Sequence, residues 1–385
     1  MNTPQERRIF DVPSARKELS LLEPDAITPD FLLGDNQSQK AEEGRMTWNQ
    51  NRRNGNLTLV EACSDSRIIL PPPSRIAVIR SITAAFPKDG FRDLIDADGM
   101  NVGVVMTHYD RRTVVPGKKP NGCGGLNARD AFENGDRKAS TEEGIHKFVE
   151  QQIKTSDPTI QAARAASEMS EHTTNPILFL TQDTITGFPY LQGIFQEGKI
   201  STLAFPIQQL WNYDEQALYA DGIPFLEEHV IPDYALEFLQ SIRNRAQGYQ
   251  RAYDSFTKRQ EEQNPPLMII STDHRPAALR YPSLDVPGQY FCITFPRKKD
   301  RIESTIQIPI EDLLVALDQT EYPITRFTNM RKILIETGDM NKSLEVAEAL
   351  AGKPWMRPWL ERGNTIMIDQ TQAGITLDIQ ELKAA

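Results

Sequence analysis

Three residues of one short segment, Cys63-Ser-Asp-Ser-Arg67, have side chains that could do chemistry together. The apolar run at residues 57–62 predicts a buried strand that ends where this segment begins. Side chains on an extended chain alternate between its two faces, so Cys63, Asp65 and Arg67 would point the same way. The segment therefore predicts a soft metal ligand, a carboxylate and a guanidinium side by side.

Two further candidate metal ligands lie downstream, within sixty residues of Cys63. His108 follows the apolar segment 102–106, and Cys123 stands in Gly122-Cys-Gly-Gly125. At Cys123 a loop is expected to turn toward a helix, where backbone amides and the helix dipole favour a thiolate. Both positions therefore suit a metal ligand.

Together these residues form a set suited to catalytic zinc. Such sites take three protein ligands and leave a fourth position for water, and Cys63, His108 and Cys123 would supply the three. Arg67 would hold Asp65 ionised and oriented, so that Asp65 accepts a hydrogen bond from a metal-bound hydroxide. The predicted chemistry is the generation of a nucleophile from bound water. Two other interpretations of the cysteines stay open, as small buried side chains or as a redox pair.

The predicted elements form an α/β fold with a mostly parallel central sheet flanked by helices. Open α/β sheets place their sites at the carboxyl ends of strands, where Cys63 and His108 would lie. Strands are expected at residues 57–62, 76–79, 102–106, 177–180 and 190–205, with a hairpin turn at 197–199, and helices at residues 38–53, 142–154, 158–172 and 225–262.

The composition narrows the classes of function. A net charge of −10 argues against a general nucleic-acid binder, and three cysteines in 385 residues do not make a disulfide framework. No apolar run approaches the roughly 20 residues needed to span a bilayer. The first 40 residues contain acidic side chains and no apolar core segment, which predicts neither a signal nor a transit peptide. We expect a cytoplasmic protein without nucleic-acid or membrane partners.

The segment around Cys63 has a counterpart later in the chain. Residues 56–67 lie over residues 264–275 without a gap. The matched pairs are Asp65 with Asp273, Arg67 with Arg275, and Cys63 with Ser271. The second copy thus keeps the carboxylate and the guanidinium but not the thiol.

Three later segments match in the same order, namely residues 83–87 over 292–296, 102–108 over 332–338, and 194–200 over 368–375. The second of these matches puts Gly338 at the place of His108. Four matches in order favour a duplication over the general likeness of strand–loop segments in α/β proteins. The expected organisation is an N-terminal extended arm (1–40), a metal-binding repeat (41–210), a linker with a long helix (211–262) and a degenerate, metal-free repeat (263–385).

The residues of the first repeat resemble the β-class carbonic anhydrases, whose motifs are Cys-x-Asp-x-Arg and His-x-x-Cys-Gly-Gly. The resemblance covers residues 50–205, and the degenerate copy extends it to the end. It implies Zn²⁺ bound by Cys63, His108 and Cys123, with the Asp65–Arg67 pair as catalytic dyad, and reversible hydration of carbon dioxide to bicarbonate by a lyase. Members of that family form tight dimers with active sites at the subunit interface. The two repeats would therefore make a pseudo-dimer, and two chains could form a homodimer of pseudo-dimers.

Two departures from the family pattern leave alternatives open. Fourteen residues separate His108 from Cys123, where the family has two, and the usual Arg-Asn-Ala-Gly-Asn segment reads Arg80-Ser-Ile-Thr-Ala. The long loop either returns Cys123 to the metal or marks an altered site. The alternative functions are a carbonyl sulfide or carbon disulfide hydrolase on the same scaffold, and a catalytically silent zinc-binding structural or regulatory protein.

Overall fold

The structure of the chain is a computed structural model. It describes residues 35–81, 84, 103–110, 158–171, 173–196, 198–202, 233–251, 267–281, 284–285, 287–294, 298–299, 306–307, 317, 320–327, 329–337, 340–369 and 379–382. Residues 1–34 of the expected arm (1–40), the expected helix at 142–154 and Cys123 lie outside these residues, and residues 35–40 are helical instead of extended. Within the described ranges, no helix is both long enough and apolar enough to cross a membrane.

Strands from the first part of the chain form one mixed sheet. They are β1 (Thr58–Cys63), β2 (Ile76–Ser81), β3 (Gly103–Tyr109), β4 (Ile177–Asp183), β5 (Pro189–Gln196) and β6 (Lys199–Thr202). Their order is β2-β1-β3-β4-β5-β6, with β2, β1, β3 and β4 parallel and β5 and β6 antiparallel. Every residue of β1 is buried, as a central parallel strand covered on both faces requires. The expected strands are confirmed, and Gly198 makes the turn between β5 and β6 with a φ of 74°.

Strands from the last part form a second sheet beside the first. They are β7 (Leu267–Ser271), β8 (Tyr290–Thr294), β11 (Lys332–Glu336), β12 (Thr365–Asp369) and β13 (Ile379–Leu382). Their order is β13-β12-β11-β7-β8, in which only β13 is antiparallel to its neighbour. This order repeats that of β5-β4-β3-β1-β2. A separate two-stranded ribbon pairs β9 (Lys298–Lys299) with β10 (Ile306–Gln307).

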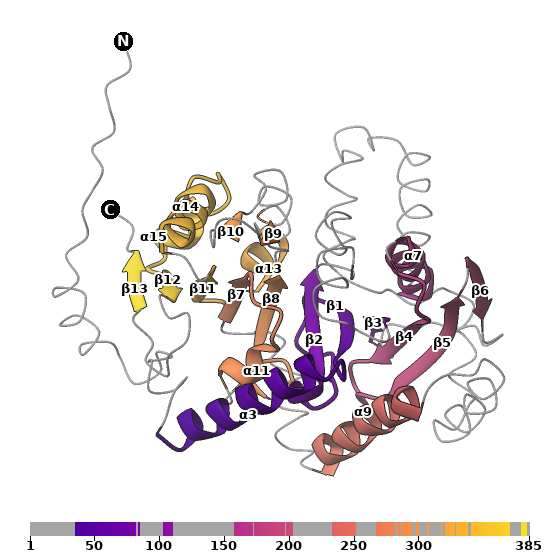
Figure 1. The fold of residues 1–385 in the computed structure, drawn as a ribbon. Helices are drawn as coiled ribbons and strands as arrows, with labels where there is room; N and C mark the ends of the chain where they lie inside the picture. Colours follow the sequence, from indigo (N-terminus) through magenta and orange to yellow (C-terminus); the bar gives the residue numbers. More distant parts are fainter. Residues whose placement is uncertain are drawn as a thin grey trace, which may run out of the picture.

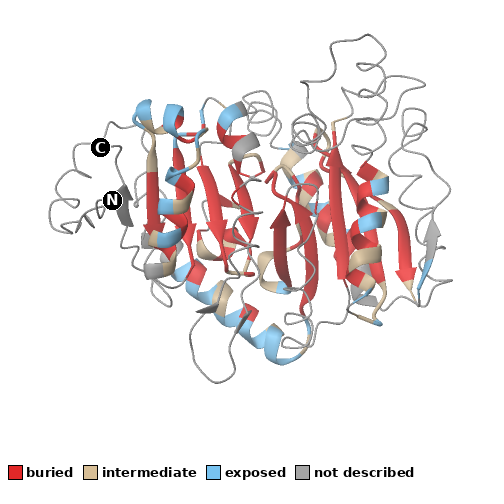
Figure 2. Cartoon of the chain, turned by 90° about the horizontal axis from the view of Figure 1, so that it is seen from above, coloured by how far each residue is buried: buried red, intermediate tan, exposed pale blue. Residues whose placement is uncertain are grey.

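Helices cover both faces of the strands (Figures 1 and 2). They are α3 (Asp35–Arg53), α7 (Pro158–Ser170), α9 (Asp233–Arg251), α11 (Ala277–Arg280), α13 (Glu321–Arg326), α14 (Met340–Ala351), α15 (Arg357–Glu361) and the 3₁₀ turn η1 (Pro73–Arg75). Helix α7 packs on one face of the first sheet, and its small residues Ala162 and Ala166 are fully buried there. Helix α9 covers the opposite face with Leu239, Ile242 and Ala246, so the expected linker helix is part of the first core.

Helix α3 runs along the base of both sheets (Figure 1). On the first side, the Trp48 indole Nε1 donates to the Ile76 carbonyl over 2.7 Å. On the other side, Gly44 approaches Leu279 of α11 so closely that a Cβ there would lie 2.7 Å from a leucine methyl. The absence of a side chain at Gly44 therefore allows one helix to contact both halves.

Strands β2 and β8 face each other where the two sheets meet. The Val78 amide donates to the His274 carbonyl over 2.8 Å, and the Cys292 amide donates to the Ser64 carbonyl over 2.9 Å. Each bond joins the loop after the first strand of one half to the second strand of the other half. The contact is thus reciprocal, as in a two-fold interface.

Strand registers correct three of the sequence matches. Leu59 pairs with Gly103 and Leu267 with Lys332, so the residue at the place of His108 is Thr337 and not Gly338. By the same reasoning, Cys292 occupies the place of Ile79 and not of Thr83. Ile368 lies on β12, which has the place of β4 and not of β5. Apolar strand sequences match in several registers, and only the hydrogen-bonded pairing selects one.

Candidate metal centre

The Asp65 carboxylate and the Arg67 guanidinium form a tight pair directly after β1. Arg67 donates from Nε and Nη2 to Asp65 Oδ2, over 2.8 and 2.5 Å, and its backbone amide donates to Oδ1 over 2.9 Å. Burial by itself would raise the pKa of Asp65, but Arg67, with help from His108, lowers it to about 2. The carboxylate is therefore ionised at neutral pH and held in one orientation.

His108 lies next to this pair, near the end of β3. Its Nε2 is 3.9 Å from Asp65 Oδ2 and is a buried atom with no hydrogen bond in the described part of the chain. Burial would lower the pKa of His108, but the neighbouring Cys63 thiol and Asp65 carboxylate raise it. The structure thus brings Cys63, Asp65, Arg67 and His108 into one cluster.

The proposed third ligand, Cys123, lies outside the described residues. Within the described ranges, no three His, Cys, Asp or Glu side chains are grouped closely enough to hold a metal ion. The donor set still fits zinc as far as it is described. The Cys63 thiol and the His108 imidazole lie together beside the ionised Asp65, and His108 Nε2 has no hydrogen bond to any described residue.

Two buried side chains that the sequence did not identify hold the loop after β1. Arg80 Nη1 donates to the Cys63 and Asp65 carbonyls over 2.8 and 3.0 Å. Gln182 Oε1 accepts from the Ile69 amide over 2.7 Å, and its Nε2 donates to the Ile69 carbonyl over 3.2 Å. Both residues stand next to last in strands that begin with an apolar run, and a long polar side chain at such a place was the available signal.

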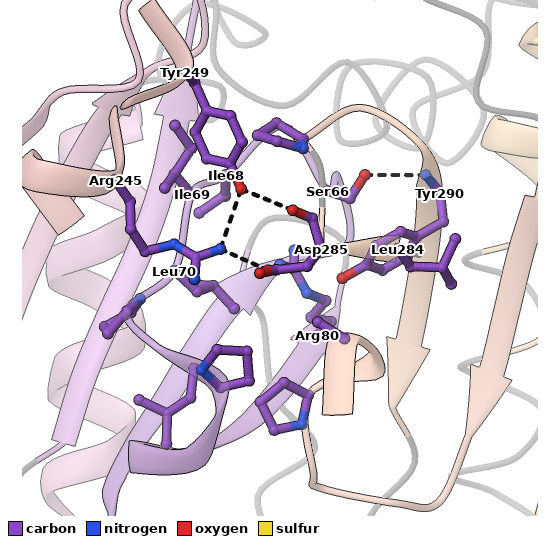
Figure 3. Close-up of a pocket in the computed structure, with 16 residues that line it drawn as sticks. Ser66, Ile68, Ile69, Leu70, Arg80, Arg245, Tyr249, Leu284, Asp285 and Tyr290 are labelled. Atoms are coloured by element: carbon purple, nitrogen blue, oxygen red, sulfur yellow. Dashed lines mark hydrogen bonds and ion pairs between the residues drawn. The ribbon is translucent and has the colours of Figure 1, made fainter. Parts of the chain in front are cut away.

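The second half reaches the same loop from the other side. The Tyr290 amide donates to Ser66 Oγ over 3.0 Å, the Ser66 amide donates to the Tyr290 carbonyl over 3.3 Å, and Asp65 makes an antiparallel bridge with Phe291. Figure 3 shows Ser66, Arg80 and Tyr290 lining a pocket of about 40 Å³ between the halves. The loop of the first half therefore pairs with β8 at the edge of the second sheet.

The loop after β7 in the second half also has an Asp–Arg ion pair, but it lacks the candidate metal ligands of the first half. The Arg275 amide donates to Asp273 Oδ1 over 2.9 Å, and Arg275 Nε donates to Oδ2 over 2.9 Å. Ser271 stands at the place of Cys63, and its Oγ accepts from the Asp273 amide. The hydroxyl of Thr337, at the place of His108, lies 2.8 Å from that of Ser343.

Arg280 lies beneath this second loop. Its Nη1 donates to the Asp273 and Arg275 carbonyls over 3.2 and 2.9 Å, and its Nη2 lies 2.9 Å from Glu336 Oε2. Burial would lower the pKa of Arg280, but Glu336 and Asp273 raise it. The cation beneath the second loop is therefore neutralised by carboxylates of its own half.

No protein-family model matches the sequence, and no curated protein matches it. Several solved structures are similar. The β-carbonic anhydrase of Coccomyxa in complex with acetazolamide is 13% identical, covering 49% of this chain and 97% of that one with a TM-score of 0.28. The β-carbonic anhydrase CafA of Aspergillus fumigatus is 16% identical (47% and 93% covered, TM-score 0.24). A mutant of CafD from the same fungus is 19% identical (35% and 88% covered, TM-score 0.20). Likeness of this degree carries no argument about the activity of this chain.

Proposed function

We propose that the chain is a zinc-dependent lyase that converts carbon dioxide reversibly to bicarbonate. The observation that carries the proposal is the position of His108 Nε2, which is buried 3.9 Å from the ionised Asp65 and has no hydrogen bond to any described residue. A buried polar atom left without a partner costs about 1–3 kcal/mol. Such an atom beside a thiol and a carboxylate is suited to a ligand that the polypeptide itself does not supply.

The metal ligands in this proposal are Cys63, His108 and Cys123. Zinc bound there would lower the pKa of a water molecule and so supply a nucleophile at neutral pH. The fourteen residues between His108 and Cys123 would form a loop that leaves the site and returns to it.

Asp65 and Arg67 have separate tasks. Because its pKa is about 2, Asp65 has no proton to donate at neutral pH and can only accept a hydrogen bond. A fixed acceptor selects one orientation of the attacking hydroxyl group, and Arg67 keeps that acceptor in place through three hydrogen bonds. The dyad thus orients the nucleophile and does not transfer its proton.

We further propose that the two halves are copies of one unit and that the second replaces the partner subunit of a dimer. The common strand order, the reciprocal bonds between β2 and β8, and the two Asp–Arg pairs support this duplication. Ser271 and Thr337 stand where the first half has Cys63 and His108, so the second half binds no zinc. The substrate site then belongs to the first half alone.

Stopped-flow hydration of carbon dioxide, with zinc content measured on the same samples, tests this function. Cys63→Ser should lose zinc and at least about 100-fold in kcat/KM, since even residues outside the first coordination shell contribute about 10–100-fold. Cys292→Ser is the matched control, because Cys292 is also a buried thiol but lies on β8. Equal rates for wild type and Cys63→Ser would overturn the proposal.

The short distance from Asp65 to His108 Nε2 favours one second candidate, a zinc protein without turnover. If Asp65 took the fourth coordination position, water would be excluded and the site would be closed. In that case the wild type would contain one zinc ion per chain and hydrate no carbon dioxide. Asp65→Asn would then lower zinc affinity.

A further inference from the structure

Arg80 is a buried cation that no described carboxylate balances. The residue is 3% exposed on β2 and makes no ion pair with any described residue. Its side chain contacts the carbonyls of Cys63 and Asp65 and the ring of Tyr290. Burying an unpaired charge lowers the stability of the folded state. We therefore expect Arg80 to have a role other than stabilising the fold.

The hydrogen bonds of Arg80 fall on the backbone of the proposed metal site. One nitrogen, Nη1, donates to both Cys63 O and Asp65 O, and the carbonyl between them, that of Ser64, accepts from the Cys292 amide. Three consecutive carbonyls are therefore fixed at once. Because side-chain direction follows backbone orientation, this fixes where the Cys63 thiol and the Asp65 carboxylate point.

The second half supplies the support under Arg80. The Arg80 guanidinium carbon lies 5.8 Å from the centre of the Tyr290 ring, within the range of a cation–π interaction. The backbone of Tyr290 is bonded to Ser66 in both directions, so the ring is held in register with the loop (Figure 3). A desolvated cation–π contact compensates in part for the missing carboxylate.

In the second half, for which no zinc site is proposed, Arg280 makes hydrogen bonds like those of Arg80. Arg280 also donates from Nη1 to two loop carbonyls, but it pairs with Glu336 at 2.9 Å. The strand register puts Thr107 at the place of Glu336, and Thr107 is neutral. Among the described residues, the first half thus has the same kind of positioning bonds and no carboxylate paired with Arg80.

We propose that Arg80 is a positioning residue, which with Tyr290 of the second half fixes Cys63 and Asp65 in the geometry that metal binding requires. The inference rests on the proposed zinc site and extends it. The second half then contributes to the proposed metal site, because its Tyr290 supports Arg80 of the first half.

The test uses the full-length chain with Arg80→Met, which removes the charge and the donors at similar volume. Cobalt binding, followed by the thiolate-to-cobalt absorption of Cys63, gives a readout that does not depend on turnover, and a chelator competition gives zinc affinity. We expect about 10–100-fold weaker zinc binding and an altered cobalt spectrum. The unfolding temperature of the metal-free protein shows whether the variant is folded.

Arg245→Met is the matched control. Arg245 lines the same pocket and carries the same charge, but its hydrogen bonds to described residues go to Asp285 at 2.6 Å and to Tyr249 at 3.2 Å, and not to the loop carbonyls (Figure 3). The Arg245→Met variant should have a lower unfolding temperature and an unchanged cobalt spectrum.

Two variants of Tyr290 test the part of the second half. Tyr290→Phe, which keeps the ring face, should bind cobalt as the wild type does, whereas Tyr290→Leu should resemble Arg80→Met. The Tyr290 pair keeps the test decisive if Arg80→Met does not fold.

The failures of the two proposals are distinguishable. If the wild type binds neither cobalt nor zinc, the proposed function fails. If the wild type binds cobalt and folded Arg80→Met binds it equally well with the same spectrum, the zinc site stands and the positioning role of Arg80 is refuted. Equal cobalt spectra for Tyr290→Leu and Tyr290→Phe would refute the part assigned to the second half.

Discussion

The two loops that follow β1 and β7 have the same Asp–Arg pair and differ in the residues that end the adjoining strands. Both have an aspartate that accepts from the amide and the guanidinium of the arginine two residues later. In the second half, Ser271 and Thr337 find hydrogen-bond partners within their own half. In the first half, Cys63 and His108 occupy these positions, and His108 Nε2 is buried without a hydrogen bond to any described residue. The Asp–Arg pair is thus common to both halves, whereas only the first half has a thiol and an imidazole at these two positions.

The arginines beneath the two loops, Arg80 and Arg280, differ in their partners. Arg280 is balanced by Glu336, while Arg80 relies on the ring of a tyrosine from the other half. The charge of Arg280 is thus balanced within its own half, whereas the contact of Arg80 with Tyr290 joins the two halves.

The largest effect is expected when the first loop is converted toward the second. His108→Thr should abolish zinc binding and reduce carbon dioxide hydration by at least about 100-fold, because a proposed ligand is lost. Zinc analysis and stopped-flow hydration measure this. The reverse change, Thr337→His, should gain no zinc, since Ser271 supplies no thiolate. Zinc bound at full occupancy by His108→Thr would contradict the comparison.

Glu336→Gln should have the largest effect on stability and none on the site. It leaves the buried Arg280 without its main carboxylate partner, at a cost of about 3–5 kcal/mol in the free energy of unfolding. Urea denaturation measures this cost. Cobalt binding should remain that of the wild type, because Glu336 lies on β11 of the second sheet, paired with Ser271, and not on a strand that carries a proposed ligand. A changed cobalt spectrum in the folded variant would show that the halves are not separable in this way.

Stability should depend on pH through Asp273. Burial would raise the pKa of this carboxyl, but Arg280 and Arg275 lower it far below its ordinary value. Because the folded pKa is depressed, the stabilisation is complete above the unfolded pKa of about 3.9 and is lost as the pH falls below it. Asp273→Asn should therefore show a smaller fall in unfolding temperature than the wild type when the pH is lowered from about 5 to about 3. Parallel curves for the two proteins would contradict this.

The smallest effect is expected at the contact between the halves. Ser66→Ala removes the acceptor of the Tyr290 amide and should cost about 1 kcal/mol, which is within reach of chemical denaturation. Zinc affinity should fall less than in Arg80→Met, since the carbonyl bonds of Arg80 remain. A larger loss of zinc affinity in Ser66→Ala than in Arg80→Met would reverse the roles assigned to these residues.

Local sequence patterns predicted most of the described strands and helices, and they identified the residues clustered around Cys63. The apolar runs at 57–62, 76–79 and 177–180 form buried strands, and the alanine-rich segment contains α7, whose small face packs on the sheet. The expected alternation along a strand was wrong for Arg67, because β1 ends at Cys63 and a turn at residues 66–67 brings the Arg67 amide to the Asp65 carboxylate. Sequence similarity alone misplaced the counterparts of His108 and Cys292, because β-branched and apolar residues match equally well when a strand is shifted.

By itself, the sequence determined which chemistry is available: a thiol, a carboxylate–guanidinium pair and an imidazole at strand ends, with a second loop that lacks the thiol and the imidazole. Only the tertiary structure decided what surrounds them. The unsatisfied His108 Nε2, the unbalanced Arg80 and its support by Tyr290 depend on residues up to 224 positions apart being brought into contact. Such contacts have no local signature, because burial and hydrogen bonding are properties of the assembled core and not of the segments that enter it.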